Sequence, residues 1–65
     1  MRIYLNGEPQ QTAAASIAEL LAELSIEGRM MAVEKNLEVV PKSLYAETAL
    51  AEDDRIEIVH MIGGG

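Results

Sequence analysis

The sequence contains no cysteine, no tryptophan and no phenylalanine, and Tyr4 and Tyr45 are its only aromatic residues. Without cysteine, the chain has no disulfide framework, no thiolate nucleophile and no cysteine-ligated metal site. Because aromatic residues make up only 3% of the chain, the core has to be built from aliphatic side chains. Hydrophobic residues fill 49% of the 65 positions, a share typical of one small globular domain rather than of a disordered chain.

Basic side chains are also scarce. The chain has 5 lysines and arginines against 11 acidic residues, which gives a net charge of −6. Nucleic acids and anionic membranes bind basic surfaces, so this balance argues against both as partners. It permits a protein partner with a basic surface, although solubility alone accounts for most of these charges.

The chain offers no long apolar run. Arg2 follows Met1 directly, and Asn6-Gly7 interrupts the first apolar segment. We therefore expect neither a secretory signal nor a membrane-spanning helix, because both need a longer uninterrupted apolar stretch. These features together predict a cytoplasmic protein.

No group of residues in the sequence resembles a catalytic or metal-binding centre. His60 is the only histidine, and without a second histidine or a cysteine we do not expect a zinc site. Glu52-Asp53-Asp54 lacks the Asp-x-Asp-x-Asp-Gly pattern of a calcium loop, so we interpret it as a solvated turn. The chain also lacks the Gly-x-x-x-x-Gly-Lys loop that cradles nucleotide phosphates. We expect neither an enzyme nor a metal site.

The start of the chain predicts a β-hairpin. Residues 1–5 alternate in the manner of a half-buried strand. Asn6-Gly7 is typical of a type I′ turn, in which both central residues need a positive φ. Residues 10–13 then provide the returning strand, with Pro9 at its edge or start.

A helix is expected next, beginning at Ser16. Ser16 and Glu19 have the spacing of a capping box, in which each side chain satisfies a free N–H group at the helix start. Gly28 suits the helix end, as a left-handed cap or as the turn just after it. The buried stripe of this helix consists of Ile17, Leu20, Leu21 and Leu24.

The second half of the chain predicts three more strands. The expected elements are a strand over 30–35, a turn at Asn36, a strand over 37–40, a loop with a helical or 3₁₀ turn over 42–50, a polar turn over 52–54 and a strand over 55–61. The first and last strands are the most apolar, so we expect them side by side and parallel at the sheet centre, with the helix across one face. In the last strand, Ile56 and Ile58 face one way and Val59 and Met61 the other.

Three glycines, Gly63, Gly64 and Gly65, follow the last strand. Glycine lacks a Cβ atom and adopts positive φ freely, so three in succession predict a thin, extended and flexible tail. From Met61 to Gly65 such a tail reaches on the order of 17 Å. We therefore divide the chain into a domain over 1–62 and a tail over 63–65. A carboxylate on a narrow stalk suits delivery into the active site of another protein, whereas a frayed terminus is the alternative.

Taken together, the Asn6-Gly7 hairpin, the capped helix, the acidic turn, the apolar last strand and the final Gly64-Gly65 resemble the ubiquitin-like β-grasp sulfur carriers. In length the chain is similar to the ThiS-type carriers of thiamine biosynthesis. The resemblance covers the whole chain and implies an α+β fold, with a mixed sheet of four to five strands and one main helix on one face.

The resemblance also implies a function as a sulfur carrier acted on by partner enzymes. The Gly65 carboxylate would be adenylated by an E1-like, ThiF-like adenylyltransferase that uses ATP, while the carrier itself holds no cofactor. A sulfur donor such as a cysteine desulfurase system would supply sulfur for a C-terminal thiocarboxylate, which then serves a ThiG-like thiazole synthase. Gly64 would be the required neighbour of Gly65. Gly63 is an extra glycine where relatives often have a side chain, and it lengthens the tail that enters the partner's channel.

The docking surface for these partners is expected near the tail. We predict Val59, Met61 and Ile62 as docking residues, on the open face of the sheet. For Val59 and Met61, coverage by the loop over 44–50 is the alternative. Two other functions stay open: a molybdopterin-type (MoaD-like) sulfur carrier, and a β-grasp interaction module whose glycines have no role.

Overall fold

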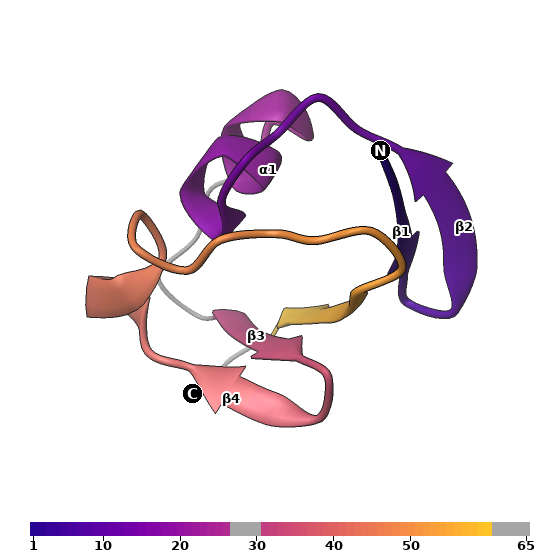
Figure 1. The fold of residues 1–65 in the computed structure, drawn as a ribbon. Coiled ribbons are helices and arrows are strands. Elements are labelled where there is room, and N and C mark those ends of the chain that lie inside the picture. The colour runs from indigo at the N-terminus through magenta and orange to yellow at the C-terminus, as the bar shows by residue number, and fades with distance from the viewer. Residues whose placement is uncertain (27–30, 61–65) are drawn as a thin grey trace.

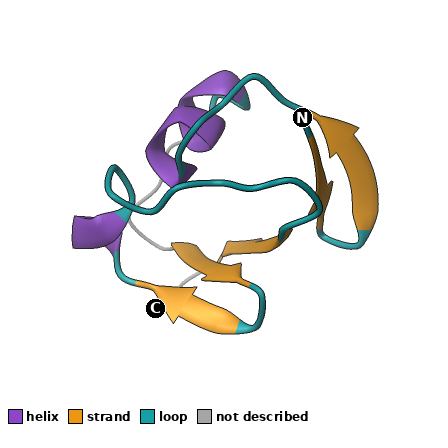
Figure 2. Cartoon of the chain, viewed as in Figure 1, coloured by secondary structure: helices purple, strands orange, loops and turns teal. Residues whose placement is uncertain are grey.

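The structure, a computed structural model, describes residues 1–26 and 31–60. The described elements are β1 (Arg2–Leu5), β2 (Glu8–Gln11), α1 (Ile17–Glu23), β3 (Met31–Lys35), β4 (Glu38–Val40), the 3₁₀ turn η1 (Lys42–Leu44) and β5 (Arg55–His60). The strands form one mixed sheet in the order β2-β1-β5-β3-β4. Figure 1 shows α1 and the segment between η1 and β5 on the same side of this sheet, and Figure 2 distinguishes helix, strand and loop.

β5 is the middle strand of the sheet. It runs parallel to β1, with Leu5 opposite Ile56, and antiparallel to β3, with Val33 opposite Ile58. Ile56 and Val33 are 0% exposed, because these positions face the layer formed by α1. The predicted parallel pairing of the first and last strands, with the helix across one face, is therefore confirmed.

The hairpin of β1 and β2 turns through Asn6 and Gly7, whose φ angles are +50° and +86°. The two-residue turn places Glu8 directly opposite Leu5, so β2 begins there. The prediction of a returning strand over 10–13 was therefore wrong by two residues. Pro9 lies inside β2. Proline has no N–H group to donate to a neighbouring strand, and it is tolerated here because β2 is an edge strand.

Helix α1 begins as expected. The Ser16 hydroxyl accepts a hydrogen bond from the Glu19 N–H at 3.2 Å, and the Glu19 carboxylate accepts one from the Ala15 N–H at 3.1 Å. The second bond differs from a standard capping box by one residue. The predicted apolar stripe is confirmed, with Ile17, Leu20 and Leu21 buried and Leu24 partly buried against the same core.

The helix ends earlier than the sequence suggested. Ser25 has a φ of +56°, its N–H donates to the Ala22 carbonyl at 3.1 Å, and the Ile26 N–H donates to the Leu21 carbonyl at 2.9 Å. This pair of bonds is the Schellman arrangement, which usually has glycine at the left-handed position. Ser25, and not Gly28, therefore ends α1. Gly28 itself lies outside the described residues.

The segment between β4 and β5 completes the cover of the core. η1 confirms the expected 3₁₀ turn, and Tyr45 and Leu50 bury their side chains beside α1. Backbone hydrogen bonds tie this segment to the helix start, from the Ile17 N–H to the Thr48 carbonyl and from the Leu50 N–H to the Ala15 carbonyl, both at 3.0 Å. The core thus lies between one face of the sheet and a layer made of α1 and this segment.

Two further predictions were wrong. They concern the turn between β3 and β4 and the polar turn before β5. Leu37 has a φ of +71° and belongs to the turn with Asn36, so β4 begins at Glu38 rather than at residue 37. Asp54 is only 9% exposed, so residues 52–54 are not simply a solvated turn. Its neighbours Glu52 and Asp53 are exposed, as expected.

Within residues 1–26 and 31–60, no helix is long and apolar enough to cross a membrane.

Candidate functional site

The chain reaches its C-terminal residues from the centre of the sheet, because β5 is the middle strand and ends at His60. The predicted site residues Met61, Ile62, Gly63, Gly64 and Gly65 lie outside the described residues, as does the boundary between the domain over 1–62 and the tail. Of the predicted site residues, the structure places Val59.

Val59 lies on the open face of the sheet. Its side chain is 48% exposed, and it stands opposite Ala32 of β3. The loop over 44–50 packs with α1 on the other face, so the alternative that this loop covers Val59 is wrong. Val59 is therefore available for contact with a partner, one residue before the end of the described chain.

Two asparagines hold β5 in place from its two sides. The Asn6 side chain accepts from the Ile58 N–H at 2.9 Å and donates to the Ile58 carbonyl at 3.4 Å. The Asn36 Oδ1 atom accepts a hydrogen bond from the Arg55 backbone N–H at 2.9 Å. The Asn36 backbone N–H donates to the Arg55 carbonyl at 2.8 Å. Both asparagines occupy turns with positive φ, so each turn also fixes the register of the middle strand. The sequence indicated the turns but not these bonds.

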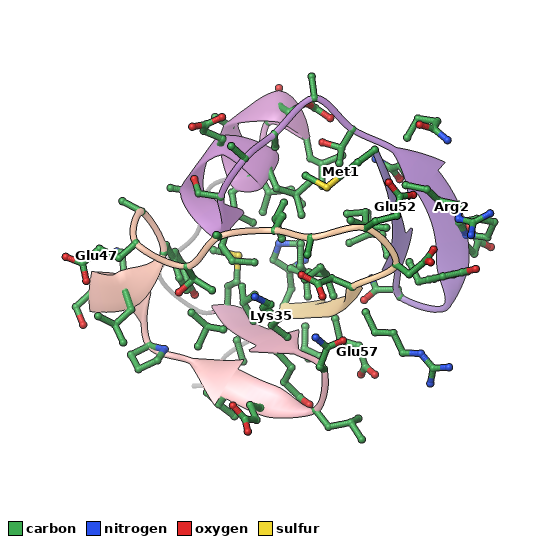
Figure 3. All side chains as sticks on the ribbon, in the orientation of Figure 1. Met1, Arg2, Lys35, Glu47, Glu52 and Glu57 are labelled. Atoms are coloured by element: carbon green, nitrogen blue, oxygen red, sulfur yellow. The ribbon has the colours of Figure 1, made fainter. Side chains whose placement is uncertain are left out.

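A polar cluster around the buried Asp54 fastens the start of β5. The Asp54 carboxylate accepts from the Asn36 side chain at 3.0 Å and from the Ala51 N–H at 2.8 Å, and it lies 3.5 Å from the Lys35 Nζ atom. Lys35 also donates to the Ala49 carbonyl at 2.7 Å. Figure 3 shows Lys35 between β3 and the segment that leads from η1 to β5. Burial disfavours the carboxylate, but the hydrogen bonds from Asn36 and Ala51 and the Lys35 charge outweigh it and lower the pKa of Asp54.

At the other end of the polar turn, Arg2 of β1 binds Asp53. Its guanidinium lies 2.8 Å from the Asp53 carboxylate and 5.5 Å from the centroid of the Tyr4 ring. Both partners of the ion pair are about half exposed, so this pair contributes little to stability. The pair links the acidic turn to β1.

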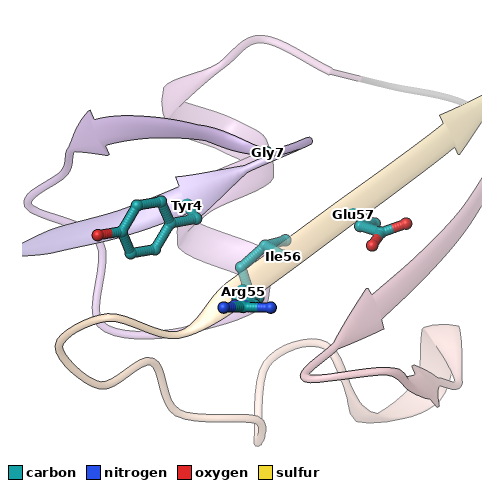
Figure 4. Close-up of a pocket in the computed structure, with 5 residues that line it drawn as sticks. All are labelled: Tyr4, Gly7, Arg55, Ile56 and Glu57. Atoms are coloured by element: carbon teal, nitrogen blue, oxygen red, sulfur yellow. The ribbon is translucent and has the colours of Figure 1, made fainter.

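The open face contains a shallow hollow of about 380 Å³ between β1 and β5, lined by Tyr4, Gly7, Arg55, Ile56 and Glu57. Figure 4 shows the Tyr4 ring on β1 beside the start of β5, where Arg55 lies. The described residues bring no three His, Asp or Glu side chains together in a way that could hold a metal ion.

Comparison with known proteins agrees with this arrangement. Residues 3–65 match the model of the ThiS family. The chain is 44% identical to the sulfur carrier protein ThiS of Bacillus subtilis, over 97% of this chain and 98% of that protein. It is also similar to the crystal structure of a thiamine biosynthesis protein (ThiS) from Geobacter metallireducens, with a TM-score of 0.85, 29% identity and full coverage of both chains. The predicted ubiquitin-like β-grasp fold is therefore confirmed.

Longer relatives also match. A thiazole synthase of Paramagnetospirillum magneticum is 48% identical over 66 aligned residues, which include all of this chain. A thiazole synthase of Magnetococcus marinus is 47% identical over the same length. This chain spans only 20% of either protein.

Proposed function

Because this chain belongs to the ThiS family, we propose that it is a sulfur carrier protein of thiamine biosynthesis whose Gly65 carboxylate receives the sulfur. The observation that carries the proposal is the 44% identity to the Bacillus subtilis sulfur carrier, which extends over 98% of that protein. The similarity of the fold to the Geobacter metallireducens ThiS structure supports it. This similarity favours the thiamine pathway over a molybdopterin-type carrier. It also argues against an interaction module without a carrier function.

The proposed chemistry takes place at the carboxylate of Gly65. A C-terminal carboxyl group has a pKa of about 3.5, so it is ionised at neutral pH and can attack the α-phosphate of ATP. Pyrophosphate leaves, and the resulting acyl-adenylate has a leaving group that the free carboxylate lacks. The terminal sulfur of a donor persulfide then attacks the carbonyl carbon, and AMP departs with one carboxylate oxygen. A second thiol cleaves the resulting acyl disulfide by thiol–disulfide exchange. The product is a thiocarboxylate with sulfur in place of that oxygen.

The glycines suit this chemistry. Gly64 and Gly65 have no Cβ atom, so their backbone can pass through a narrow channel and bring the terminal carbonyl close to a phosphate. Gly63 extends the segment without side chains by one residue. In this proposal the carrier is the substrate, and the partners supply catalysis and ATP binding.

We propose three kinds of partner. An E1-like adenylyltransferase activates Gly65, a sulfur donor such as a cysteine desulfurase system supplies the sulfur, and a thiazole synthase consumes it. The thiazole synthases that align with this chain support the last of these, because they combine a carrier-like segment and a synthase name in one protein. Val59, Met61 and Ile62 are proposed to contact the partner at the root of the tail, supported by the exposure of Val59 on the open face.

Intact-protein mass spectrometry tests the proposal. The chain ending at Gly65 is incubated with an E1-like adenylating enzyme of the ThiF type, ATP and a sulfur donor. The expected result is the mass gain of one oxygen-for-sulfur exchange, localised to Gly65 by fragmentation. A chain that lacks Gly64 and Gly65 is the matched control. No mass change, with an enzyme that modifies its own carrier in the same assay, would contradict the proposal and favour an interaction module.

A further inference from the structure

The open face of the sheet has a charge pattern that the described residues do not satisfy. In the register of β3 and β5, Glu34 stands directly opposite Glu57. In the register of β3 and β4, Val39 stands opposite Glu34 on its other side. These side chains share one face, because strand neighbours opposite one another point the same way, and the buried pair of Val33 and Ile58 points to the core.

Like charges directly opposite each other in an antiparallel pair are destabilising. Among the described residues, neither Glu34 nor Glu57 has an ion pair or a side-chain hydrogen bond. Arg55 lies two residues before Glu57 on the same face, where it lines the hollow beside Tyr4 and forms no ion pair with Glu57. Lys35 points to the other face and is bound to Asp54 and Ala49. The fold therefore retains a repulsive pair.

Apolar side chains flank the two carboxylates. Val39 is 70% exposed and Val59 is 48% exposed. Ala32 lies opposite Val59, two residues before Glu34 on the same face of β3. Arginine and lysine combine an apolar stem with a cationic end, so a surface of valines around two carboxylates is complementary to such a side chain. Charge complementarity of this kind fixes the orientation of a partner and accelerates its association.

We propose that the open face receives an arginine or lysine side chain of the adenylating partner, with its cationic group between Glu34 and Glu57 and its stem against Val39 and Val59. This inference rests on the proposed function and adds the chemistry of the contact. The net charge of −6 attracts a basic partner surface at long range, before the two proteins are in contact. The contact includes Glu57 and Val59 of β5, the strand that leads to Gly65, so it aligns the carrier before the carboxylate enters the partner's active site.

The test uses the full chain with Glu34→Gln and Glu57→Gln combined, and binding to the adenylating enzyme is measured by titration calorimetry at two salt concentrations. The dissociation constant is expected to rise about tenfold or more, and its dependence on salt to become weaker. The unfolding midpoint of the free variant in urea is expected to rise, because the repulsion has been removed. Glu47→Gln is the matched control, since Glu47 is exposed and lies beyond η1, far from Glu57 in Figure 3.

The readouts separate this inference from the proposed function. Conversion of the wild-type chain to the thiocarboxylate tests the function, whereas the ratio of dissociation constants tests the contact. Unchanged affinity of the double variant, with normal conversion of the wild-type chain, overturns the contact and leaves the function standing. A double variant that is less stable than the wild type also overturns it, because the carboxylates would then have a structural role. Failure of the wild-type chain to be converted overturns both.

Discussion

At the residue scale, the two turns that flank β5 have the same backbone shape and different sequences. Asn6 and Gly7 have φ angles of +50° and +86°, and Asn36 and Leu37 have +50° and +71°. Glycine meets this requirement without strain, whereas a leucine in the left-handed region is disfavoured by its Cβ atom. Leu37 is also 79% exposed, so no packing offsets the strain. The turn is kept by Asn36 and its bonds to β5.

Leu37→Gly is therefore expected to stabilise the protein. Release of the backbone strain outweighs the greater freedom of glycine in the unfolded chain, for a net gain of about 0.5–1 kcal/mol. Urea denaturation at neutral pH measures the change. Leu37→Ala is the control, because it removes the same exposed side chain but keeps the Cβ atom. Equal stability of the two variants would show that the turn is not strained.

Asp54 makes the stability of the folded protein depend on pH. The pKa of Asp54 lies below that of an unfolded aspartate, because the bonds from Asn36 and Ala51 and the charge of Lys35 overcome the effect of burial. A lowered folded-state pKa means that the contribution to stability is complete above the ordinary aspartate pKa of about 3.9. The contribution is lost as the pH falls from there through the folded-state value.

We expect Asp54→Asn to be less stable than the wild type at neutral pH. The difference in unfolding free energy should stay constant from pH 7 to about pH 5 and shrink below about pH 4, as the wild-type carboxylate becomes protonated. Urea midpoints measured across this range check the prediction. Asp53→Asn serves as the control, because among the described residues the Asp53 side chain bonds only the exposed guanidinium of Arg2. A difference that stays constant down to pH 2 would contradict the assignment.

At the element scale, α1 is short and depends on its contacts with the sheet. A helix of seven residues is marginal in isolation, so its stability comes from packing and caps. Ser16 caps the start and Ser25 ends the helix, while Ile17 and Leu20 are 0% exposed. The helix thus forms only as part of the folded domain.

Leu20→Ala is expected to destabilise the domain by about 2–5 kcal/mol, because it opens a cavity between α1 and the sheet. Leu24→Ala should have a smaller effect, since Leu24 is only partly buried. Urea or thermal denaturation of the two variants side by side tests the order. If Leu20→Ala changed the unfolding free energy by only a few tenths of a kcal/mol, the assignment of the core face would be wrong.

At the scale of the whole molecule, the proposed function assigns separate roles to the body and to the C-terminal glycines. The core is closed by α1 and the loop before β5, and the residues that carry the proposed chemistry follow the middle strand. Changes at the last glycine are therefore expected to affect the partner reactions and not the fold.

Gly65→Ala should have the same urea midpoint as the wild type and be converted to the thiocarboxylate slowly or not at all. The methyl group adds bulk at the position that we propose enters the partner's active site, where glycine has no side chain. Mass spectrometry under limiting enzyme measures the rate, and Ala51→Gly, at an exposed position in the body, is a control for changes remote from the tail. Normal conversion of Gly65→Ala would contradict the idea of a narrow channel.

The sequence by itself determined the local structure where short-range rules dominate. Asn6-Gly7 specified its turn, Ser16 and Glu19 specified the helix start, and the period of Ile17, Leu20 and Leu21 specified the buried face. The alternation of β5 likewise assigned Ile58 to the core and Val59 to the open face. These features depend on neighbours within a few residues, so the pattern alone suffices to predict them.

Only the tertiary structure decided the features that depend on residues far apart in the chain. Asn36 binds Arg55 and Asp54 across 19 and 18 positions, which no local pattern encodes. The end of α1 at Ser25 was missed because the packing of Ile26 and the Schellman bonds override the preference for glycine. The opposition of Glu34 and Glu57 follows from strand register, which is fixed by the whole sheet. Local propensity sets which elements form, whereas the cooperative packing of the sheet sets which residues meet.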